Sequence, residues 1–390
     1  MDLAFWVAVA GLGYTFAGYP AVMLLLARLA PRSVRRGRAL PTVSVLIAAH
    51  NEARTIAARI ENCLALDYPH ARLEIVVASD GSTDETVAIA RRYEGTSSGP
   101  GVRVIAYPWR RGKPSVLNDS VPHCTGEILV LGDARQRYDA DAVRRLVENF
   151  TDSRVGAVSG ELHLLNDAGR AVGEGVGAYW RYEKAIRKAE SAVHSTVGAT
   201  GAIYAIRRRL FVPIPHDTLT DDVVIPLRIV RQGFRVIFDS RARAWDRVAD
   251  SARAEHVRKL RTIAGVLQVF ARERWLWLPT HPVWMQAISH KLLRLAAPFF
   301  MLTALLTSAV LAPGHGVYRV AFAAQLAFYV AAAAGALARE RSGKLARLLA
   351  IPYAFCLLNL TTLVSLWRFV RGRHSVRWQK AADAAHSEAA

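Results

Sequence analysis

The chain has 390 residues, of which 52% are hydrophobic, and it carries a formal net charge of +19. This length allows about two ordinary domains, and the charge predicts an anionic partner such as phosphate groups, nucleic acid or a membrane surface. The 3 cysteines, Cys63, Cys124 and Cys356, have no metal-ligand spacing. This excludes a cysteine-based zinc centre and indicates free thiols in a reducing compartment.

The chain opens with an apolar run from Leu3 to Ala27 that contains no charged residue. Such a run can cross a bilayer, and it is too long for a signal-peptide core and has no basic segment before it. Residues 3–29 are therefore predicted to be a retained transmembrane helix. Only Asp2 precedes the run, whereas the basic stretch Arg28 to Arg38 follows it. The positive-inside rule then predicts an outside N-terminus and a cytoplasmic domain.

Residues 41–250 alternate between strand and helix patterns. Short apolar runs predict strands at Thr42–Ala48, Glu74–Ser79, Val102–Ala106 and Glu127–Gly132, and helices include Ala53–Ala65 and Thr83–Tyr93. Continuous apolar strands separated by helices are typical of a mostly parallel sheet covered on both faces. The sequence therefore predicts an α/β domain, and ligands of such sheets bind at the carboxyl ends of the strands.

A polar residue follows each predicted strand. Glu52 follows the first, Asp80 lies in a capped turn after the second, Lys113 precedes a helix after the third, and Asp133 ends the fourth. A lysine near a helix start can neutralise phosphate, and a carboxylate can hold a cation. Taken alone, each feature is equally explained by a solvated loop or an ordinary turn. The first strand is not followed by G-x-G-x-x-G, which argues against a dinucleotide-binding domain.

The rest of the chain reads as membrane-associated. Residues 251–288 form an amphipathic stretch predicted to lie at the membrane interface, with Trp275 and Trp277 as anchors. Residues 289–370 are predicted to form about three transmembrane helices, and buried helices of a soluble protein are the alternative. The apolar runs are Leu295–Ala312, Val320–Ala338 and Leu348–Leu366.

The basic tail, residues 371–390, raises a question of topology. The basic stretch Arg339 to Lys344 before the last apolar run is expected inside. A full crossing by that run would leave the tail outside, but Pro352 and Asn359 interrupt the run. The sequence leaves the side of the tail open.

Six short stretches along the chain point to one family. They are, in order, "AAHNEA", "SDGSTDET", "RRGKPSVLN", "LGDARQ", "TGAIYAIRR" and "LTDDV". Together they resemble a family 2 glycosyltransferase, similar to the membrane-bound synthases of cellulose, chitin, hyaluronan and poly-N-acetylglucosamine. The resemblance covers most of the chain. It implies a Rossmann-like, mostly parallel GT-A domain in the cytoplasm, flanked by transmembrane helices of the inner membrane.

The resemblance also implies a role for the polar residues at the strand ends. Glu52 and Asp80 would hold the nucleotide base and ribose, and Lys113 would face the diphosphate. Asp133 would hold a Mg²⁺ or Mn²⁺ ion that bridges the diphosphate. Hard cations prefer oxygen ligands, and they stabilise the charge that develops on the leaving group.

The acids in "TDD" are the catalytic candidates. By the resemblance, Asp222 would be the general base that takes the proton of the acceptor hydroxyl, in a direct displacement that inverts the anomeric carbon. Asp221 beside it could raise the pKa of Asp222 by like-charge proximity. Two acids at a helix start are also ordinary N-terminal helix chemistry. Arg207 and Arg208 are expected to be structural.

The chain departs from the family pattern in two places. Arg135 stands where a second acid often follows Asp133; it could pair with phosphate, fold back onto Asp133, or lie in solvent. The stretch "RKLRTIAG" stands where the synthases carry Q-x-x-R-W. There Arg261 matches the arginine, Arg258 replaces the glutamine, and Thr262 replaces a tryptophan that could stack on a sugar. These three residues and Gly201 are the candidates for contact with acceptor or phosphate.

Three functions are compatible with these features. The first is extension of a β-linked polysaccharide from a UDP-sugar donor. The second is transfer of one sugar to a lipid-linked acceptor in the inner leaflet, and the third is a non-catalytic nucleotide-sugar-binding subunit. The expected partners are the donor, the acceptor, membrane lipids and accessory export subunits. Membrane and phosphate account for the basic charge, so no nucleic acid partner is expected.

Overall fold

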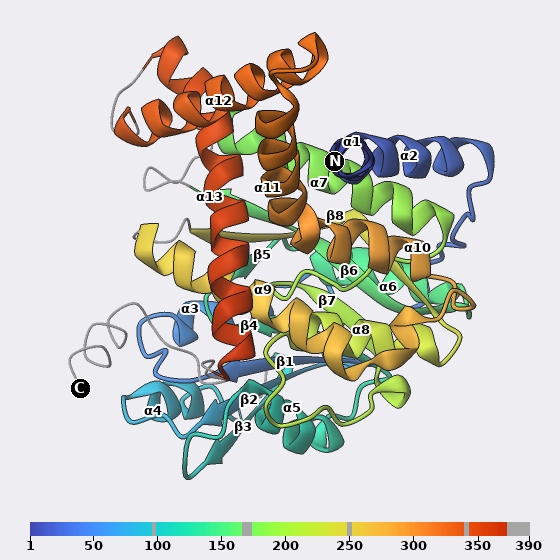
Figure 1. Ribbon diagram of the computed structural model, residues 1–390. Coiled ribbons are helices and arrows are strands. Elements are labelled where there is room, and N and C mark those ends of the chain that lie inside the picture. The colour runs from blue at the N-terminus through green and yellow to red at the C-terminus, as the bar shows by residue number, and fades with distance from the viewer. Residues whose placement is uncertain (96–98, 166–173, 248–251, 339–342, 373–390) are drawn as a thin grey trace.

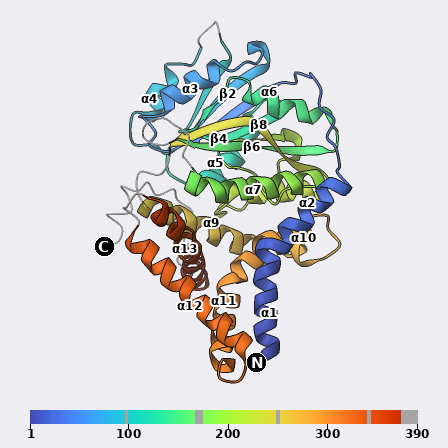
Figure 2. The ribbon, with the colours of Figure 1, turned by 90° about the horizontal axis from the view of Figure 1, so that it is seen from above.

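The structure, a computed structural model, describes residues 1–95, 99–165, 174–247, 252–338 and 343–372. It consists of an α/β domain and a set of long apolar helices that extend from one face of that domain (Figures 1 and 2). The tail beyond residue 372 lies outside the described residues, so its side of the membrane stays open.

Eight strands form one sheet in the order β3-β2-β1-β4-β7-β6-β8-β5. In chain order they are β1 (Val43–Ala49), β2 (Leu73–Asp80), β3 (Gly101–Tyr107), β4 (Ile128–Asp133), β5 (Arg137–Tyr138), β6 (Val155–Leu165), β7 (Tyr204–Arg207) and β8 (Arg235–Arg247). The strands β1 to β4 pair in parallel. β7 runs antiparallel to β4 and β6, β6 pairs in parallel with β8, and β5 is antiparallel to β8. The sheet is thus parallel where the apolar runs predicted strands, and mixed beyond them.

Helices cover both faces of the sheet. They are α3 (Ile56–Leu64), η2 (His70–Arg72), α4 (Thr86–Arg91), α5 (Lys113–Ser120), η3 (Val121–His123), α6 (Ala142–Val147), η4 (Glu148–Thr151), α7 (Glu174–Val193), η5 (Arg208–Leu210), α8 (Asp221–Arg231), α9 (Ala252–Arg272) and η6 (Arg274–Trp277). Alternate side chains of β1, such as Ile47 and Leu46, enter different cores. Ile47 packs with α3 and α6, and Leu46 packs with α5, α8 and α9. Because both faces are buried, these strands read as continuous apolar runs.

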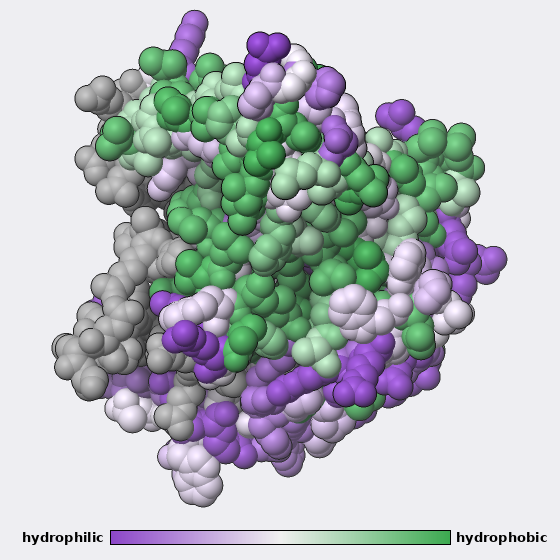
Figure 3. All heavy atoms as spheres, in the orientation of Figure 1, coloured by the Kyte–Doolittle hydropathy of each residue, from purple (hydrophilic) through white to green (hydrophobic). Residues whose placement is uncertain are grey.

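Four helical segments of the described chain are long and apolar enough to span a membrane, and they correspond to the four predicted spans. They are Asp2–Leu29, made of α1 (Asp2–Gly13), η1 (Tyr14–Gly18) and α2 (Tyr19–Leu29); Trp284–Leu311, made of α10 (Trp284–Gln286), η7 (Ala287–Leu292) and α11 (Leu293–Leu311); α12 (Gly316–Leu337); and α13 (Lys344–Val370). Apolar side chains gather on the face that these helices present in Figure 3. The chain is therefore an integral membrane protein.

A buried polar network joins α7 to the membrane helices. The hydroxyl of Tyr19 donates to Glu190 Oε1 at 2.5 Å. His290 places Nδ1 2.6 Å from the same oxygen and Nε2 3.1 Å from Glu183 Oε2, and Arg294 pairs with Glu183. Buried charges are tolerated only while each keeps its partner, so the network favours one position of the domain against the helices.

The helices do not all run in the same direction. The N-terminus lies at the far end of α1 from the sheet (Figure 2), where Tyr318 at the start of α12 donates to Asp2 Oδ1 at 2.5 Å. Figure 1 looks nearly along α1, whereas α13 extends across the same view. The hydroxyl of Ser365 in α13 donates to the carbonyl of Leu260 in α9 at 3.0 Å. The last apolar run thus lies against the interfacial helix α9 instead of running parallel to α1.

We expect the α/β domain and the loop between α11 and α12 to lie on opposite sides of the membrane, with the domain in the cytoplasm. Single cysteines at Ala140 and Gly314, both exposed positions, test this with a thiol reagent that cannot cross membranes. In intact cells, Gly314→Cys should react and Ala140→Cys should react only after permeabilisation. Reaction of Ala140→Cys from outside would contradict the predicted orientation.

Candidate active site

The residues predicted from the strand ends come together at one edge of the sheet. Glu52, Asp80 and Asp133 lie at or just after the carboxyl ends of β1, β2 and β4, which are neighbours in the sheet. Lys113 and Asp221 are the first residues of α5 and α8. This is the edge at which open parallel sheets bind their ligands.

The carboxylate of Asp80 holds the loop that leads to Lys113. Its Oδ1 accepts a hydrogen bond from the Arg111 N–H (2.7 Å) and its Oδ2 from the Gly112 N–H (2.8 Å). Gly112 has a φ of 93°, a conformation that favours glycine. Both oxygens are therefore engaged in positioning the loop before α5. The predicted contact of Asp80 with base or ribose stays a prediction.

Glu52 lies in a loop that is tied to the loop after β2. Its N–H donates to Thr86 Oγ1 at 2.7 Å, and its Oε2 accepts from the Thr55 hydroxyl at 2.9 Å. The preceding residue, Asn51, has a φ of 54° and accepts from the Thr83 N–H at 2.8 Å. The two loops form one connected rim, and a nucleotide contact by Glu52 stays a prediction.

Lys113 lies between two of the acids. Its Nζ is 2.9 Å from Asp133 Oδ1 and 3.2 Å from Asp221 Oδ2, and its side chain is only 7% exposed. Burial lowers the pKa of Lys113, but the two carboxylates outweigh burial and raise it overall. For Asp133 the directions are the opposite. Burial alone would raise the pKa of Asp133, but Lys113 outweighs burial, so this pKa lies below its ordinary value. The lysine is therefore cationic and Asp133 ionised at neutral pH.

Asp222 has the opposite shift. Burial, followed by the charge of Asp221, raises the pKa of Asp222 to about 6, against the opposing charges of Lys113 and Arg261. Asp221 is 5% exposed, whereas Asp222 is partly exposed. A Cβ atom on Gly201 would lie 2.9 Å from Asp222 Oδ2, so the glycine leaves room for this carboxylate. Asp221 is therefore the buried partner of Lys113, whereas Asp222 is the accessible acid that can take up a proton near neutral pH.

Only part of the α9 stretch that was predicted to contact acceptor or phosphate reaches this site. The guanidinium of Arg261 donates to the carbonyl of Leu219, just before α8, at 3.2 Å from Nη2 and 3.3 Å from Nε. Thr262 is exposed, and its hydroxyl donates to the carbonyl of Arg258 at 3.0 Å. Arg261 therefore reaches the acidic site, and Thr262 points to the surface.

Asp133 is the residue that could hold a divalent cation. Its side chain is 26% exposed. No group of three His, Cys, Asp or Glu side chains with metal-binding geometry occurs in the described part of the chain. Mg²⁺ is commonly held by one or two carboxylates, with substrate phosphates and water as the other ligands, and such oxygen ligands also suit Mn²⁺. Asp133 fits a cation held in that way, and does not fit a site built from protein ligands alone.

Three residues near the site were not predicted. The Tyr204 hydroxyl is buried, and burial followed by the neighbouring acids raises its pKa well above the ordinary value. Gln136 accepts from the Asp133 N–H at 3.1 Å and donates to Asp246 Oδ2 at 3.0 Å. Asp246 belongs to β8, more than a hundred residues later in the chain. The sheet order brings it here, and no local pattern in the sequence marks it.

Three arginines near the sheet have different settings. Arg207 and Arg208 donate to backbone carbonyl groups, which fits the structural role expected for them. Arg135, two residues after Asp133, is 52% exposed, and its Nε lies 3.7 Å from Asp246 Oδ2. Its guanidinium is thus directed towards Asp246.

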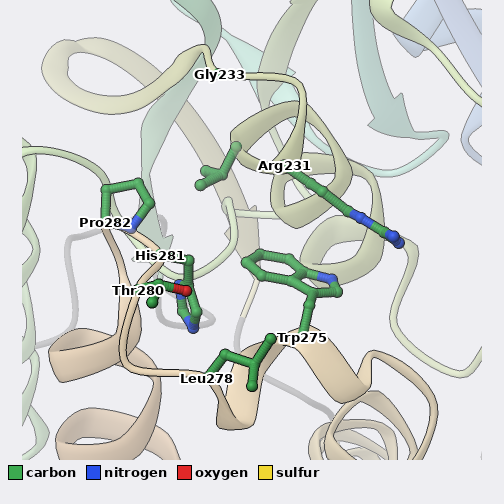
Figure 4. Close-up of a pocket in the computed structure, with 8 residues that line it drawn as sticks. Arg231, Gly233, Trp275, Leu278, Thr280, His281 and Pro282 are labelled. Atoms are coloured by element: carbon green, nitrogen blue, oxygen red, sulfur yellow. The ribbon is translucent and has the colours of Figure 1, made fainter.

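A separate cavity of about 320 Å³ lies beside the interfacial segment after α9 (Figure 4). Its lining residues are Val230, Arg231, Gly233, Trp275, Leu278, Thr280, His281 and Pro282. The rings of Trp275 and His281 contact each other edge to face, with 4.7 Å between their centroids. None of the predicted site residues lines this cavity, so it is distinct from the candidate active site.

Comparisons with known proteins identify relatives of this chain. Poly-beta-1,6-N-acetyl-D-glucosamine synthase of Staphylococcus aureus (strain COL) is 23% identical over 238 residues, which is 60% of this chain and 57% of the relative. The synthase of Staphylococcus epidermidis is 22% identical over 242 residues, or 61% and 58%. The chain thus matches less than two thirds of the length of these relatives.

A solved structure shows the same fold over nearly the whole chain. It is the mannosyltransferase PcManGT from Pyrobaculum calidifontis in complex with GDP-Man and Mn²⁺, with a TM-score of 0.73 and 24% identity, covering 95% of this chain and 100% of that one. The predicted GT-A fold with flanking membrane helices is confirmed.

Two family models match the chain. The model of glycosyl transferase family 2 matches residues 44–211, and the model of glycosyl transferase family group 2 matches residues 128–338. Because the second model spans more than half of the chain, the protein belongs to the family 2 glycosyltransferases.

Proposed function

We propose that the enzyme transfers a sugar from a UDP-sugar to a growing β-linked polysaccharide at the cytoplasmic face of the membrane, with inversion at the anomeric carbon. The observation that carries this proposal is the grouping of Lys113, Asp133, Asp221 and Asp222 between the end of β4 and the start of α8. The lysine and Asp133 are suited to a diphosphate and its cation. Asp222 is suited to accept the acceptor's proton.

In the proposed reaction, Asp222 is the general base. The acceptor hydroxyl attacks the anomeric carbon as its proton passes to Asp222. The bond from that carbon to the diphosphate oxygen breaks, and its electron pair leaves with the nucleoside diphosphate. A pKa of about 6 leaves Asp222 largely ionised at pH 7, and more basic than an ordinary aspartate.

The donor would lie along the carboxyl ends of the parallel strands. Glu52 and Asp80 would border the nucleoside, Lys113 would face the diphosphate, and Asp133 would hold Mg²⁺ or Mn²⁺. Such a cation, when bound, neutralises charge on the leaving diphosphate. The structural neighbour was solved with a nucleotide sugar and Mn²⁺, and we propose the same classes of donor and cation here on the basis of this chain's own carboxylates.

The acceptor would approach from the membrane side. Helix α9 contacts the active-site region through Arg261 and the membrane helix α13 through Leu260. The curated relatives are polysaccharide synthases by name. An acceptor that extends along α9, past Arg258 and Thr262, is consistent with both observations, and accessory export subunits would then be expected partners.

The membrane helices favour a second candidate, transfer of one sugar to a lipid-linked acceptor in the inner leaflet. The side chains of Thr307, Asn359, Thr361 and Thr362 donate to carbonyl groups of their own helices. These donors are therefore engaged within their own helices, and the four side chains do not form a row of free hydroxyl donors for a passing saccharide. A lipid-linked acceptor needs no such row.

Replacement of the base should stop chemistry and spare donor binding. We expect Asp222→Asn to reduce kcat by about 10² or more, the usual scale for loss of a general base, with UDP affinity nearly unchanged by calorimetry. Asp221→Asn should cost less, because its carboxylate pairs with Lys113 and does not take the proton. A larger loss in Asp221→Asn would show that the roles within the pair are reversed.

Removal of the proposed cation ligand should change the response to metal. Asp133→Ala should leave a low activity that no longer rises with Mg²⁺ or Mn²⁺, because the carboxylate that would hold the cation is gone. Asp67→Ala, which removes an exposed acid paired with Arg144, is the matched control and should titrate with metal as the parent does. A parental metal response in Asp133→Ala would place the cation elsewhere.

Product length distinguishes the two acceptor classes. A processive polysaccharide synthase gives long chains early beside unused acceptor when enzyme is limiting, whereas the second candidate gives singly extended lipid at every time. A Thr262→Trp variant should lengthen the products several-fold, because stacking on a sugar is worth roughly 1 kcal/mol. Thr262→Val, which adds no ring, is the control. Unchanged length in Thr262→Trp would show that the chain end is held elsewhere.

A further inference from the structure

The segment after β4 carries a cation where a second acid would be expected. Arg135 follows Asp133 by two residues, and half of its side chain is exposed. Arg135 lies in the turn that directly follows Asp133 at the end of β4. The guanidinium therefore lies close enough to act on the site proposed for the donor diphosphate.

A buried carboxylate orients this arginine. Asp246 is 8% exposed and lies 3.7 Å from the Arg135 Nε. Its Oδ1 accepts from the Arg247 N–H at 2.9 Å, and its Oδ2 accepts from Gln136 Nε2 at 3.0 Å. The separation of 3.7 Å exceeds hydrogen-bond length. Asp246 thus attracts the guanidinium electrostatically, without a close hydrogen bond from Nε.

Gln136 connects this carboxylate to the end of β4. It is 2% exposed, and its Oε1 accepts from the Asp133 N–H at 3.1 Å while its amide donates to Asp246. Arg135 belongs to the turn between β4 and β5, and 52% of its side chain is exposed. Gln136 therefore enters the protein while Arg135 projects outward beside Asp133.

We propose that Arg135 binds the diphosphate of the donor and keeps this contact while the anomeric C–O bond breaks. Asp246 and Gln136 are the residues that position it. This inference rests on the proposed function. When the anomeric C–O bond breaks, its electron pair stays on the terminal phosphate oxygen and adds negative charge there. A guanidinium offers paired N–H donors that match phosphate oxygens. Lys113 and Arg135 then flank Asp133 as two cations for one leaving group.

If Arg135 binds the diphosphate, replacing it by an acid should change the affinities for nucleotide and for metal in opposite directions. Replacing Arg135 by aspartate removes a phosphate donor and adds a carboxylate beside Asp133. The same variant should therefore bind nucleoside diphosphate more weakly without metal, and should bind Mn²⁺ more tightly. An added carboxylate acts by its own charge, so the neutral variant Arg135→Gln is the one that isolates the arginine. It should lose nucleotide affinity only if Arg135 contacts the diphosphate.

Calorimetry with UDP and GDP on the full-length protein, in EDTA and then in Mn²⁺, tests the proposal. The variants are Arg135→Lys, Arg135→Gln and Arg135→Asp, and Arg144→Gln is the control because Arg144 pairs with Asp67 on the surface. We expect affinity to fall in the order Arg, Lys, Gln, Asp, with about a tenfold loss at Gln, the scale of a hydrogen bond to a charged group. Mn²⁺ affinity, read by electron paramagnetic resonance, should rise in Arg135→Asp.

The outcomes separate this inference from the proposed function. If the parent binds UDP or GDP in either condition and the series is flat there, Arg135 does not hold the diphosphate, and the inference is overturned while the proposed function stands. If the parent binds neither nucleotide in either condition, the proposed donor class is wrong and this inference is overturned with it.

Discussion

The buried ammonium group of Lys113 is the interaction on which the active site depends. Asp133, Asp221 and Asp222 converge within a small region, and carboxylates that approach one another without a cation repel or become protonated. Lys113 lies within ion-pair distance of the first two, and breaking a buried ion pair by removing one partner costs about 3–5 kcal/mol. Lys113 thereby holds the pKa of Asp133 below its ordinary value, whereas the pKa of Asp222 is raised.

The fold places that lysine with little freedom. Asp80 at the end of β2 binds two backbone N–H groups just before Lys113, so the loop cannot drift from the sheet edge. At the end of β4, a Cβ atom on Gly132 would lie 2.1 Å from the Tyr138 hydroxyl, and that hydroxyl donates to the carbonyl of Ala202 at 3.0 Å. The Tyr138 hydroxyl therefore leaves no room for a side chain at position 132. The same hydroxyl links the end of β4, next to Asp133, to the segment that contains Gly201.

Much of this arrangement was predictable from the sequence, because parallel strands buried on both faces are continuous apolar runs and their ends are polar. The runs that end near Glu52, Asp80 and Asp133 are such cases. The second half of the sheet was harder to predict. β7 runs antiparallel to its neighbours β4 and β6, and β5 runs antiparallel to β8, and these reversals depend on long-range pairing. The same holds for Asp246, which reaches Gln136 only through the order of strands in the sheet.

The orientation of individual side chains also lay beyond the sequence. Asp80 lies in the motif from which a nucleotide contact was predicted, yet its carboxylate accepts hydrogen bonds from the backbone of the next loop. The last apolar run has the composition of a transmembrane helix, yet Ser365 fastens it to α9. In both cases a hydrogen bond between distant segments decides the geometry, and no local pattern records it.

The pH dependence of kcat/KM for the donor tests the central claim, the division of labour between the two adjacent acids. Because kcat/KM reports groups of the free enzyme, activity should fall as the pH drops through about 6, where Asp222 becomes protonated. In Asp221→Asn this acidic limb should move to lower pH, because the charge that raises the pKa of Asp222 is gone. A limb that stays in place, or that moves to higher pH, would contradict the account.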